Sequence, residues 1–506
     1  MESSVKASAA PDGVRPRGGR RRGFGTLLAV DLWERFSFYG MAAILVLYLT
    51  ASPGHGGMGM APQQATAVFA GYMSLSFVAG LPGGWLADRV LGARRAILAG
   101  GALIASGHAV LALPSAVALY AGLLLIVAGT GLVKPSLAAM VAEVGDERGG
   151  PEGAGPERGG LERAGSERGG GREAAFSLFY LCIQVSALIA PVVTGLLAER
   201  VAWHLGFAAA AIGMTAGLVQ FSLGLRRFGE VGRRPVRPLG RAEARRAVRR
   251  TLTVLAAVAV VGGAAAAAGV LDVTGVLACL GLLTLGLPLV YLRSLRSLPQ
   301  VRGALGRFTV LMAASACFWM IFAQSGSALG LFAERHTDRE IFGFEVPASW
   351  FQSVHPLFVL LVAPLFTRLW RRAGPRAGVP VKFSAALAAA GVGFLLMAVA
   401  ALLAQRGTVG PYWLLLVYLC YSCGEISLAP AGLALAAEVA PPGWTSRFLA
   451  LNGLFGAVGV VAGGQLYRLT TVLSLPLYFL LLGGGVLSVG LLVGRNAHRL
   501  VPGRES

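Results

Sequence analysis

Charged side chains are scarce in this sequence: only 13% of its 506 residues are Asp, Glu, Lys or Arg. A soluble protein of this length would normally have about 25%. Hydrophobic residues make up 55% of the chain, and its mean hydropathy is +0.68. Because a charge is costly in lipid, the shortfall indicates that most of the chain lies in a membrane.

Residue groupings that would indicate an enzyme or a disulfide-rich fold are also missing. The six histidines show no metal-ligand spacing, and neither a Gly-x-Ser-x-Gly elbow nor a P-loop occurs. All five cysteines lie inside apolar stretches, so none is placed for an extracellular disulfide. Cys420 and Cys423 have redox spacing, but their hydrophobic surroundings favour a packing role. We therefore expect no enzymatic activity, cofactor or metal.

The net charge of +20 does not indicate nucleic-acid binding, which needs a continuous basic patch on a soluble domain. The basic residues instead cluster in short gaps between apolar runs, with ten arginines between 226 and 250. Such clusters are typical of cytoplasmic loops, so both termini are predicted in the cytoplasm of a cell (inner) membrane protein. The first apolar run is too long for a cleaved signal peptide.

Apolar runs long enough to cross a membrane repeat along the chain. A spanning helix needs roughly 20 mostly apolar residues, and about fourteen runs qualify: 26–50, 63–88, 94–113, 117–142, 174–198, 204–224, 251–270, 274–292, 307–332, 347–370, 381–404, 411–437, 444–467 and 473–494. The pair between 251 and 292 has no ionisable residue apart from Asp272. Without it, six plus six spans remain, a transporter architecture with a central site between the halves.

These runs divide the chain into regions. We predict a basic cytoplasmic tail (1–25), a six-helix half (26–224), a basic loop with two extra spans (225–306), a second six-helix half (307–494) and a cytoplasmic tail (495–506). Segment 145–172 repeats Glu-Arg-Gly-Gly every ten residues. It has too little apolar surface to fold and is predicted to be a flexible cytoplasmic loop.

A few ionisable residues interrupt the spans: Asp31, Glu34, Arg35, His108, Lys134, His355 and Glu425. A charge in mid-membrane costs about 2.5 kcal/mol or more, so it is normally paired or faces a water-filled cavity. Asp31, Glu34 and Arg35 share one helix face. They could simply be buried ion pairs that hold helices together, but a cluster with partners in other spans favours a role in proton binding. His108 is interpreted as a packed histidine.

Motifs distributed over nearly the whole chain resemble those of proton-dependent oligopeptide transporters, within the major facilitator superfamily. They are Asp31-Leu-Trp-Glu-Arg-Phe-Ser-Phe-Tyr-Gly40, Gly83-Gly-Trp-Leu-Ala-Asp-Arg89, Gly129-Thr-Gly-Leu-Val-Lys-Pro135, Phe176-Ser-Leu-Phe-Tyr180, Gln324-Ser-Gly-Ser327, Pro347-Ala-Ser-Trp-Phe-Gln-Ser353 and Gly424-Glu-Ile-Ser-Leu-Ala-Pro430. The resemblance implies an all-α major facilitator fold with about 14 transmembrane helices. It also implies proton-coupled symport of di- or tripeptides by a protein expected to be a monomer.

The resemblance also implies roles for individual residues. Proton coupling would fall to Asp31, Glu34, Arg35, Lys134 and Glu425. A gating latch would involve Asp88, Arg89, Arg94 and Arg95. The substrate would meet Phe38, Tyr39, Ala42, Phe77, Lys134, Gln184, Ala323, Gln324, His355, Glu425, Ser427 and Asn452.

Eight positions differ from the residue typical of the family: Asp31, Phe38, Ala42, Phe77, Gln184, Ala323, His355 and Asn452. The alanines at 42 and 323 replace an arginine and a glutamate that are thought to pair, so their loss leaves no unpaired buried charge. Their loss also leaves Lys134 alone to meet a peptide carboxylate. His355 could replace the missing cation, or it could be a neutral packing residue.

The remaining charges suggest a stoichiometry. The net charge of the ionised set is −1, because it has three carboxylates and two cations: Asp31, Glu34 and Glu425, with Arg35 and Lys134. One bound proton neutralises it. Three readings stay open. The first is symport of peptides or peptide-like solutes, and the second is the same fold and coupling with a non-peptide metabolite or export. The third is a sensor that transports nothing.

Overall fold

The computed structural model describes residues 17–146 and 160–500, apart from short gaps at 237, 241, 244, 247–248, 251–252, 254–255, 258–259, 262, 265–267, 270–274, 276–283, 297–300, 375–376 and 442–443. The described part is almost entirely helical. Its one sheet is a two-stranded hairpin of β1 (Glu340–Ile341) and β2 (Phe344–Glu345). This confirms the predicted all-α class.

The first half of the chain folds into six spanning segments. They are α1 (Arg17–Thr50), α2 (Pro62–Val78) continued by α3 (Gly80–Leu86) and the π-helical turn η2 (Ala87–Leu91), α4 (Ala93–Leu111), α5 (Ala116–Asp146), α6 (Gly160–Arg200) and α7 (Trp203–Gly224). Short 3₁₀ turns lie at η1 (Pro53–His55) and η3 (Leu225–Phe228). We call this unit the N-half.

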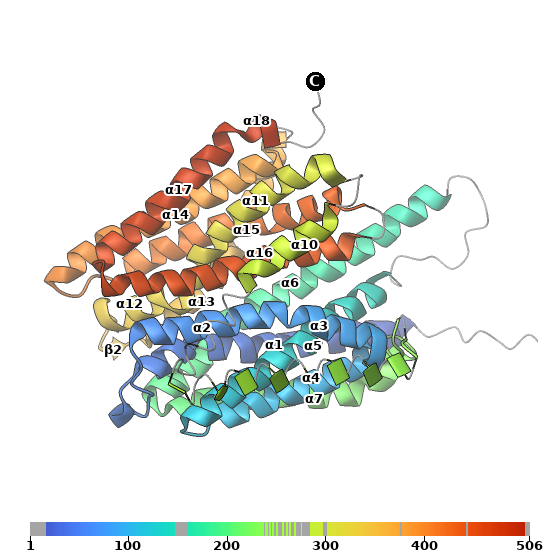
Figure 1. Cartoon of the computed structure of the whole chain (residues 1–506), viewed down its shortest axis with the longest axis horizontal. Coiled ribbons are helices and arrows are strands. Elements are labelled where there is room, and N and C mark those ends of the chain that lie inside the picture. Colours follow the sequence, from blue (N-terminus) through green and yellow to red (C-terminus); the bar gives the residue numbers. More distant parts are fainter. Residues whose placement is uncertain are drawn as a thin grey trace, which may run out of the picture.

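The second half, here the C-half, repeats the pattern. Its segments are α11 (Arg302–Phe322) continued by η6 (Ala323–Gly326) and α12 (Ala328–His336), then η7 (Ala348–Trp350) with α13 (Phe351–Ala373), α14 (Val379–Leu403) with η9 (Ala404–Arg406), α15 (Tyr412–Val439), α16 (Thr445–Leu466) with η10 (Tyr467–Thr471), and α17 (Leu475–Arg495) before α18 (Ala497–Leu500). In Figure 1 the N-half, blue to green, lies below the C-half, yellow to red.

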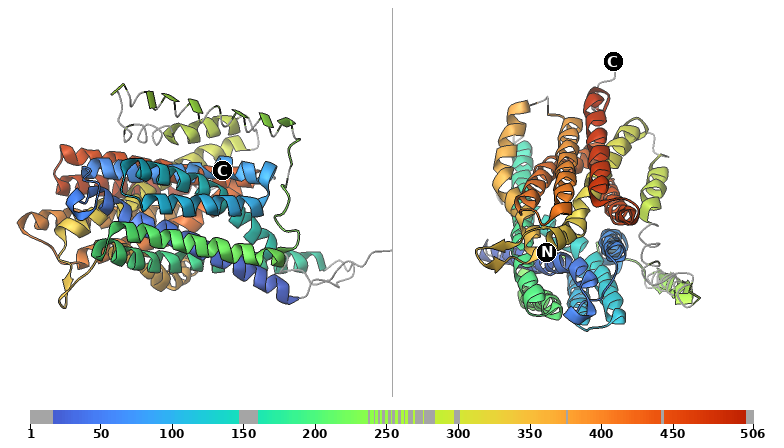
Figure 2. Two further views of the ribbon diagram at one scale, coloured as in Figure 1. Left: turned by 90° about the horizontal axis from the view of Figure 1, so that it is seen from below. Right: turned by 90° about the vertical axis from the view of Figure 1, so that its left-hand side faces the viewer.

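Eleven helices of the described residues are long and apolar enough to cross a membrane. α4 does not reach that composition because it carries Arg94, Arg95 and His108, yet it packs between α5 and α7. The twelve spans predicted for the two halves are therefore present. α1 begins and α17 ends on the same side of the bundle (Figures 1 and 2), which we call the terminal end. The opposite side, with β1 and β2, is the hairpin end.

Glycine lets neighbouring helices approach closely. A Cβ atom on Gly100 of α4 would lie 2.7 Å from the carbonyl oxygen of Gly129 on α5. The same relation in the C-half joins Gly391 of α14 to Gly483 of α17, where the added Cβ would lie 2.8 Å from the carbonyl oxygen. Because lipid gives helices little hydrophobic reason to associate, such close backbone contacts supply much of the packing energy.

The segment that links the two halves is described only in part. The extra spans predicted at 251–270 and 274–292 lie largely outside the described residues. The described part includes η4 (Thr284–Gly286) and α10 (Leu287–Leu295). Thr284 forms a 3.1 Å side-chain hydrogen bond with Ser74 of α2, and both η4 and α10 contact α16. This part of the linker therefore touches both halves.

One predicted boundary needs correction. The flexible loop expected over 145–172 is helical from Gly160 onward, because α6 extends toward the terminal end beyond the apolar run that begins near 174. The glycine-rich composition concealed this extension, since glycine weakens a helix without forbidding it. α5 likewise runs to Asp146, and residues 147–159 lie outside the described part.

Candidate functional site

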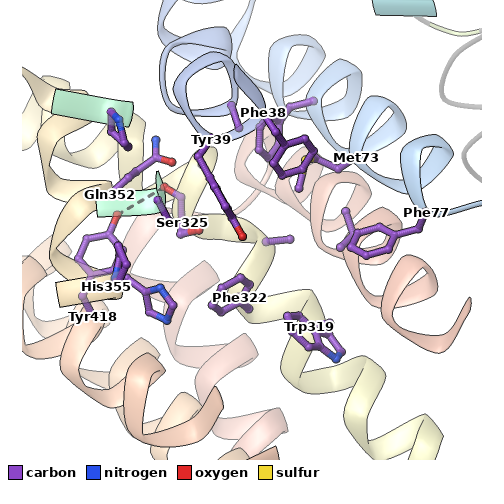
Figure 3. A pocket seen from close by; sticks show the side chains of 18 residues that line it. Phe38, Tyr39, Met73, Phe77, Trp319, Phe322, Ser325, Gln352, His355 and Tyr418 are labelled. Carbon is purple, nitrogen blue, oxygen red and sulfur yellow. Dashed lines mark hydrogen bonds between the residues drawn. The ribbon is translucent and has the colours of Figure 1, made fainter. Parts of the chain in front are cut away.

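A cavity lies between the two halves at mid-helix and encloses about 750 Å³ of empty space, part of it open to solvent. Its N-half wall comes from α1, α2 and α6, and its C-half wall from α11, η6, α13, α15 and α16. Figure 3 shows Tyr39 pointing from α1 into this space, toward Phe322 on the opposite wall. The position matches the central site predicted between six-helix halves.

The wall is aromatic and apolar. Its ring-bearing side chains are Phe38, Tyr39, Phe69, Phe77, Trp319, Phe322, His355 and Tyr418. Ser325 and Gln352 add polar groups, and the Tyr418 hydroxyl donates to the Ser325 carbonyl over 3.5 Å. Among the described residues that line the cavity there is no Asp, Glu, Lys or Arg. A solute in this space therefore meets ring faces and a few neutral polar groups.

The charged cluster on α1 lies behind this wall. Asp31 is completely buried and Glu34 is 1% exposed. The Arg35 Nε atom lies 3.3 Å from Asp31 Oδ1 and 3.4 Å from Glu34 Oε2, so one guanidinium serves two carboxylates. None of the four carboxylate oxygens makes a hydrogen bond within the described part of the chain. Two buried anions with one paired cation suit a group that takes up a proton.

Lys134 on α5 lies against two aromatic rings of the N-half, within the field of Glu34 and Asp31. Its Nζ atom lies 4.1 Å from the ring centroid of Phe38 and 5.8 Å from that of Phe77. Among the described residues it forms no ion pair within 4 Å. The two phenylalanines stand where the family typically has hydroxyl-bearing rings, and here their faces hold the ammonium by cation–π attraction. Lys134 is thus placed beside the cavity rather than in it.

A second charged pair joins α13 to α15 in the C-half. The His355 Nε2 atom lies 2.9 Å from Glu425 Oε2, and each side chain is 13% exposed. Ser422 Oγ donates to the His355 carbonyl over 3.0 Å, and the Phe322 ring meets the imidazole edge-to-face at 5.1 Å. His355 lines the cavity while Glu425 stands behind it. The open question about His355 is answered in part: it faces a carboxylate.

The structure divides the twelve residues predicted to meet substrate. Six line the cavity: Phe38, Tyr39, Ala42, Phe77, Ala323 and His355. The other six, Lys134, Gln184, Gln324, Glu425, Ser427 and Asn452, are not part of its described wall. Gln324, for example, is fully buried and donates its amide to the Gly463 carbonyl over 2.8 Å, which fastens η6 to α16.

Several wall residues were not among those predicted to meet substrate, chiefly Trp319, Phe322, Gln352 and Tyr418. Uncharged residues inside an apolar run resemble ordinary packing residues, so their exposure to a cavity leaves no compositional signal. Two of them lie next to quoted motifs, Trp319 before Gln324 and Gln352 within 347–353. A search along the helix faces of those motifs would have found both.

The hairpin end of the cavity is closed by a carboxylate that the sequence analysis did not single out. Glu199, near the end of α6, accepts three hydrogen bonds from the start of the η7–α13 segment. They come from the backbone N–H groups of Ala348 (2.7 Å) and Ser349 (3.0 Å) and from the Ser349 hydroxyl (2.6 Å). A carboxylate in this position satisfies N–H groups that a helix start leaves free. The cap crosses from one half to the other.

We call Glu199 and its partners Ala348 and Ser349 the Glu199 latch. Two arginines add further contacts at the same end. The Arg339 guanidinium lies 2.7 Å from Glu345 and 4.0 Å from Glu199. Arg200 also pairs with Glu345, reaching from α6 to the hairpin. Phe77, toward the terminal end of α2, is 43% exposed, so the cavity opens on the side away from the latch.

The predicted gating residues lie at the terminal end of the N-half. Arg94 donates from Nε to the Val231 carbonyl (2.6 Å) and from its terminal nitrogen to the Gly229 carbonyl (2.5 Å). Asp88 lies beside a hollow that Glu143, Glu230 and Arg234 also line. Both hydrogen bonds tie Arg94 to the chain after α7, within its own half. This structure therefore shows Arg94 as an internal clamp.

Comparisons with known proteins agree with one another. The family model described as "POT family" matches residues 94–480. A di-/tripeptide transporter of Lactococcus lactis subsp. lactis (strain IL1403) is 33% identical over 498 residues, covering 94% of each chain. The uncharacterized transporter YclF of Bacillus subtilis (strain 168) is 32% identical and covers 93% of each chain. A crystal structure of a peptide transporter POT in complex with sulfate superposes with a TM-score of 0.86, at 34% identity over 95% of each chain.

Proposed function

Since this chain belongs to the POT family of proton-dependent oligopeptide transporters within the major facilitator superfamily, we propose that it is a proton-coupled symporter of di- or tripeptides or peptide-like solutes. It is a multi-pass membrane protein and not an enzyme. We place it in the cell membrane with both termini in the cytoplasm, as a monomer that binds solute and protons from one side and releases them to the other.

The buried α1 cluster carries the proposal. Asp31 and Glu34 are 0% and 1% exposed and share the single guanidinium of Arg35. Keeping both carboxylates ionised there leaves one negative charge short of a close partner, which is costly inside a membrane. Taking up one proton removes that cost. Counting Glu425 and Lys134 as well leaves the net charge of the ionised set at −1, so one proton per cycle neutralises it.

Alternating access supplies the movement. The cavity is closed toward the hairpin end by the Glu199 latch and open toward the terminal end, as expected for one of the two states of a rocking pair of halves. Opening the hairpin end must break the three hydrogen bonds to Glu199. Proton binding on α1 and solute binding between the halves would then shift the balance between the two states.

The apolar wall favours a second candidate within the same mechanism. Without a charged residue among its described lining, the cavity suits a peptide-like metabolite better than a free zwitterion. Import and export are both compatible with a rocking mechanism, and the direction of the proton gradient would decide between them.

Gradient-driven uptake tests the proposal. Purified protein in liposomes is given a labelled dipeptide or its N-acetyl derivative, with an inward proton gradient. We expect accumulation of at least one of them above a gradient-free control, and its loss on adding a protonophore. Equal uptake with and without the gradient would contradict proton coupling.

A further inference from the structure

The cavity has no free anion for a positively charged solute. A peptide with a free amino end brings an ammonium group, and burying it without a carboxylate partner is costly. The carboxylates buried around the site lie behind the wall and face protein groups: Asp31 and Glu34 share Arg35 at 3.3 and 3.4 Å, and Glu425 lies 2.9 Å from His355. The described wall itself contains none.

His355 stands between Glu425 and the solute. Its imidazole is part of the cavity wall, whereas Glu425 is not. Two contacts hold the ring in this position, because Ser422 binds the His355 carbonyl at 3.0 Å and Phe322 lies against the ring edge. The histidine therefore supplies, from the protein itself, the partner that Glu425 would otherwise seek in a solute.

The surrounding rings indicate what the solute carries instead. Phe322 lies against His355 on the C-half side, Trp319 packs on the far side of Phe322, and Tyr39 reaches across from α1 (Figure 3). Tyr418 lines the same wall. Aromatic faces and edges attract apolar and planar groups, including an amide or acyl group next to an aromatic side chain. A blocked amino end brings no ammonium group to this wall, so the carboxylate is the one ionised group that such a solute carries.

From this geometry we infer that the cavity takes peptide-like solutes whose α-amino group is blocked, such as N-acylated dipeptides with an apolar or aromatic side chain. The inference rests on the proposed transport function and refines its substrate class. His355 acts as the specificity-determining residue because it occupies Glu425. A side chain that left Glu425 free would admit a solute ammonium in its place.

The test compares two solutes that differ only at the amino end. Labelled Ala-Phe and N-acetyl-Ala-Phe are presented separately, at equal concentrations below saturation, to the full-length protein in liposomes with an inward proton gradient. We expect the acetylated dipeptide to enter at least tenfold faster. Faster or equal uptake of free Ala-Phe would overturn the inference while leaving the proposed function intact. Accumulation of neither solute would overturn both.

Variants separate the role of His355 from general damage. His355→Asn removes the imidazole and frees Glu425, so the preference for the acetylated solute should fall at least tenfold. Glu425→Gln removes the anion and should keep the preference, which is measured for this variant by counterflow because Glu425 belongs to the proposed coupling set. His336→Asn, on α12 at the hairpin end, is the matched control and should also keep it. The uptake ratio is taken within one preparation, so a lower yield does not affect it. An unchanged ratio in His355→Asn, or a lost preference in Glu425→Gln, would overturn the inference.

Discussion

The Glu199 latch gives the sharpest prediction about movement. In Glu199→Gln the side chain keeps its length and one carbonyl oxygen but loses its charge and its second acceptor oxygen. The carboxylate accepts three hydrogen bonds of 2.6–3.0 Å from Ala348 and Ser349. At least one must be lost, because the amide nitrogen of glutamine donates and cannot accept from an N–H group.

The size of the effect follows from these contacts. Hydrogen bonds to a charged group contribute roughly 1.5–3 kcal/mol each. The Glu199 side chain is 13% exposed, so solvent screens it little. If only one hydrogen bond is lost, the state with the hairpin end closed should be destabilised by about 1.5–3 kcal/mol. This shifts the balance between closed and open states by roughly 10- to 150-fold.

Distance measurements between the halves would detect the shift. Spin labels at Val201, after α6, and at Phe342, at the hairpin tip, occupy exposed positions on opposite sides of the latch. The background would have its native cysteines replaced. We expect the Glu199→Gln distance distribution to gain a longer component that is weak or missing in the unmodified chain.

The control is Glu438→Gln, at an exposed position near the end of α15 that lies away from the hairpin. Loss of this carboxylate should leave the distribution unchanged. Two results would refute the reasoning: an unchanged distribution in Glu199→Gln, or an equal broadening in both variants. Either would show that the cap between the halves does not hold the hairpin end closed.

Three further predictions concern other contacts. Lys134→Ala should abolish gradient-driven accumulation but preserve counterflow of labelled solute; accumulation at the level of the unmodified chain would contradict the role of Lys134 in coupling. Gly464→Ala would force a methyl group against Ala70 and within 3.0 Å of the Thr66 carbonyl oxygen, across the contact between the halves. It should therefore open the hairpin end, as measured by the same spin labels. The control Gly453→Ala, where an added Cβ meets nothing within 4 Å, should leave the hairpin end closed. Arg94→Lys should lower stability by about 1.5–3 kcal/mol because lysine cannot reach both carbonyls, and a melting temperature equal to that of the exposed-site control Arg95→Lys would contradict the clamp.

The helices of both halves were predictable because each needs a long apolar run, and lipid permits few alternatives. The shared face of Asp31, Glu34 and Arg35 also followed from sequence spacing alone, and the ion pairs confirm it. Local spacing along one helix fixes such contacts whatever the rest of the chain does.

Contacts between distant segments were harder to predict. His355 and Glu425 are 70 positions apart in the numbering, and nothing in either motif states that they meet at 2.9 Å. The packing of Lys134 on the rings of Phe38 and Phe77 was likewise not predicted. Glu199 was not singled out from the sequence. Its role depends on how the two halves dock, and no sequence pattern indicates that arrangement.

Proton movement accompanying solute entry tests the central claim most directly. Liposomes containing the purified protein and a trapped pH-sensitive dye, at equal internal and external pH and with an inside-negative potential, receive N-acetyl-Ala-Phe or Ala-Phe outside. The account predicts that the interior acidifies only when a transported solute is added, by about one proton per solute molecule. Solute entry without acidification would contradict it.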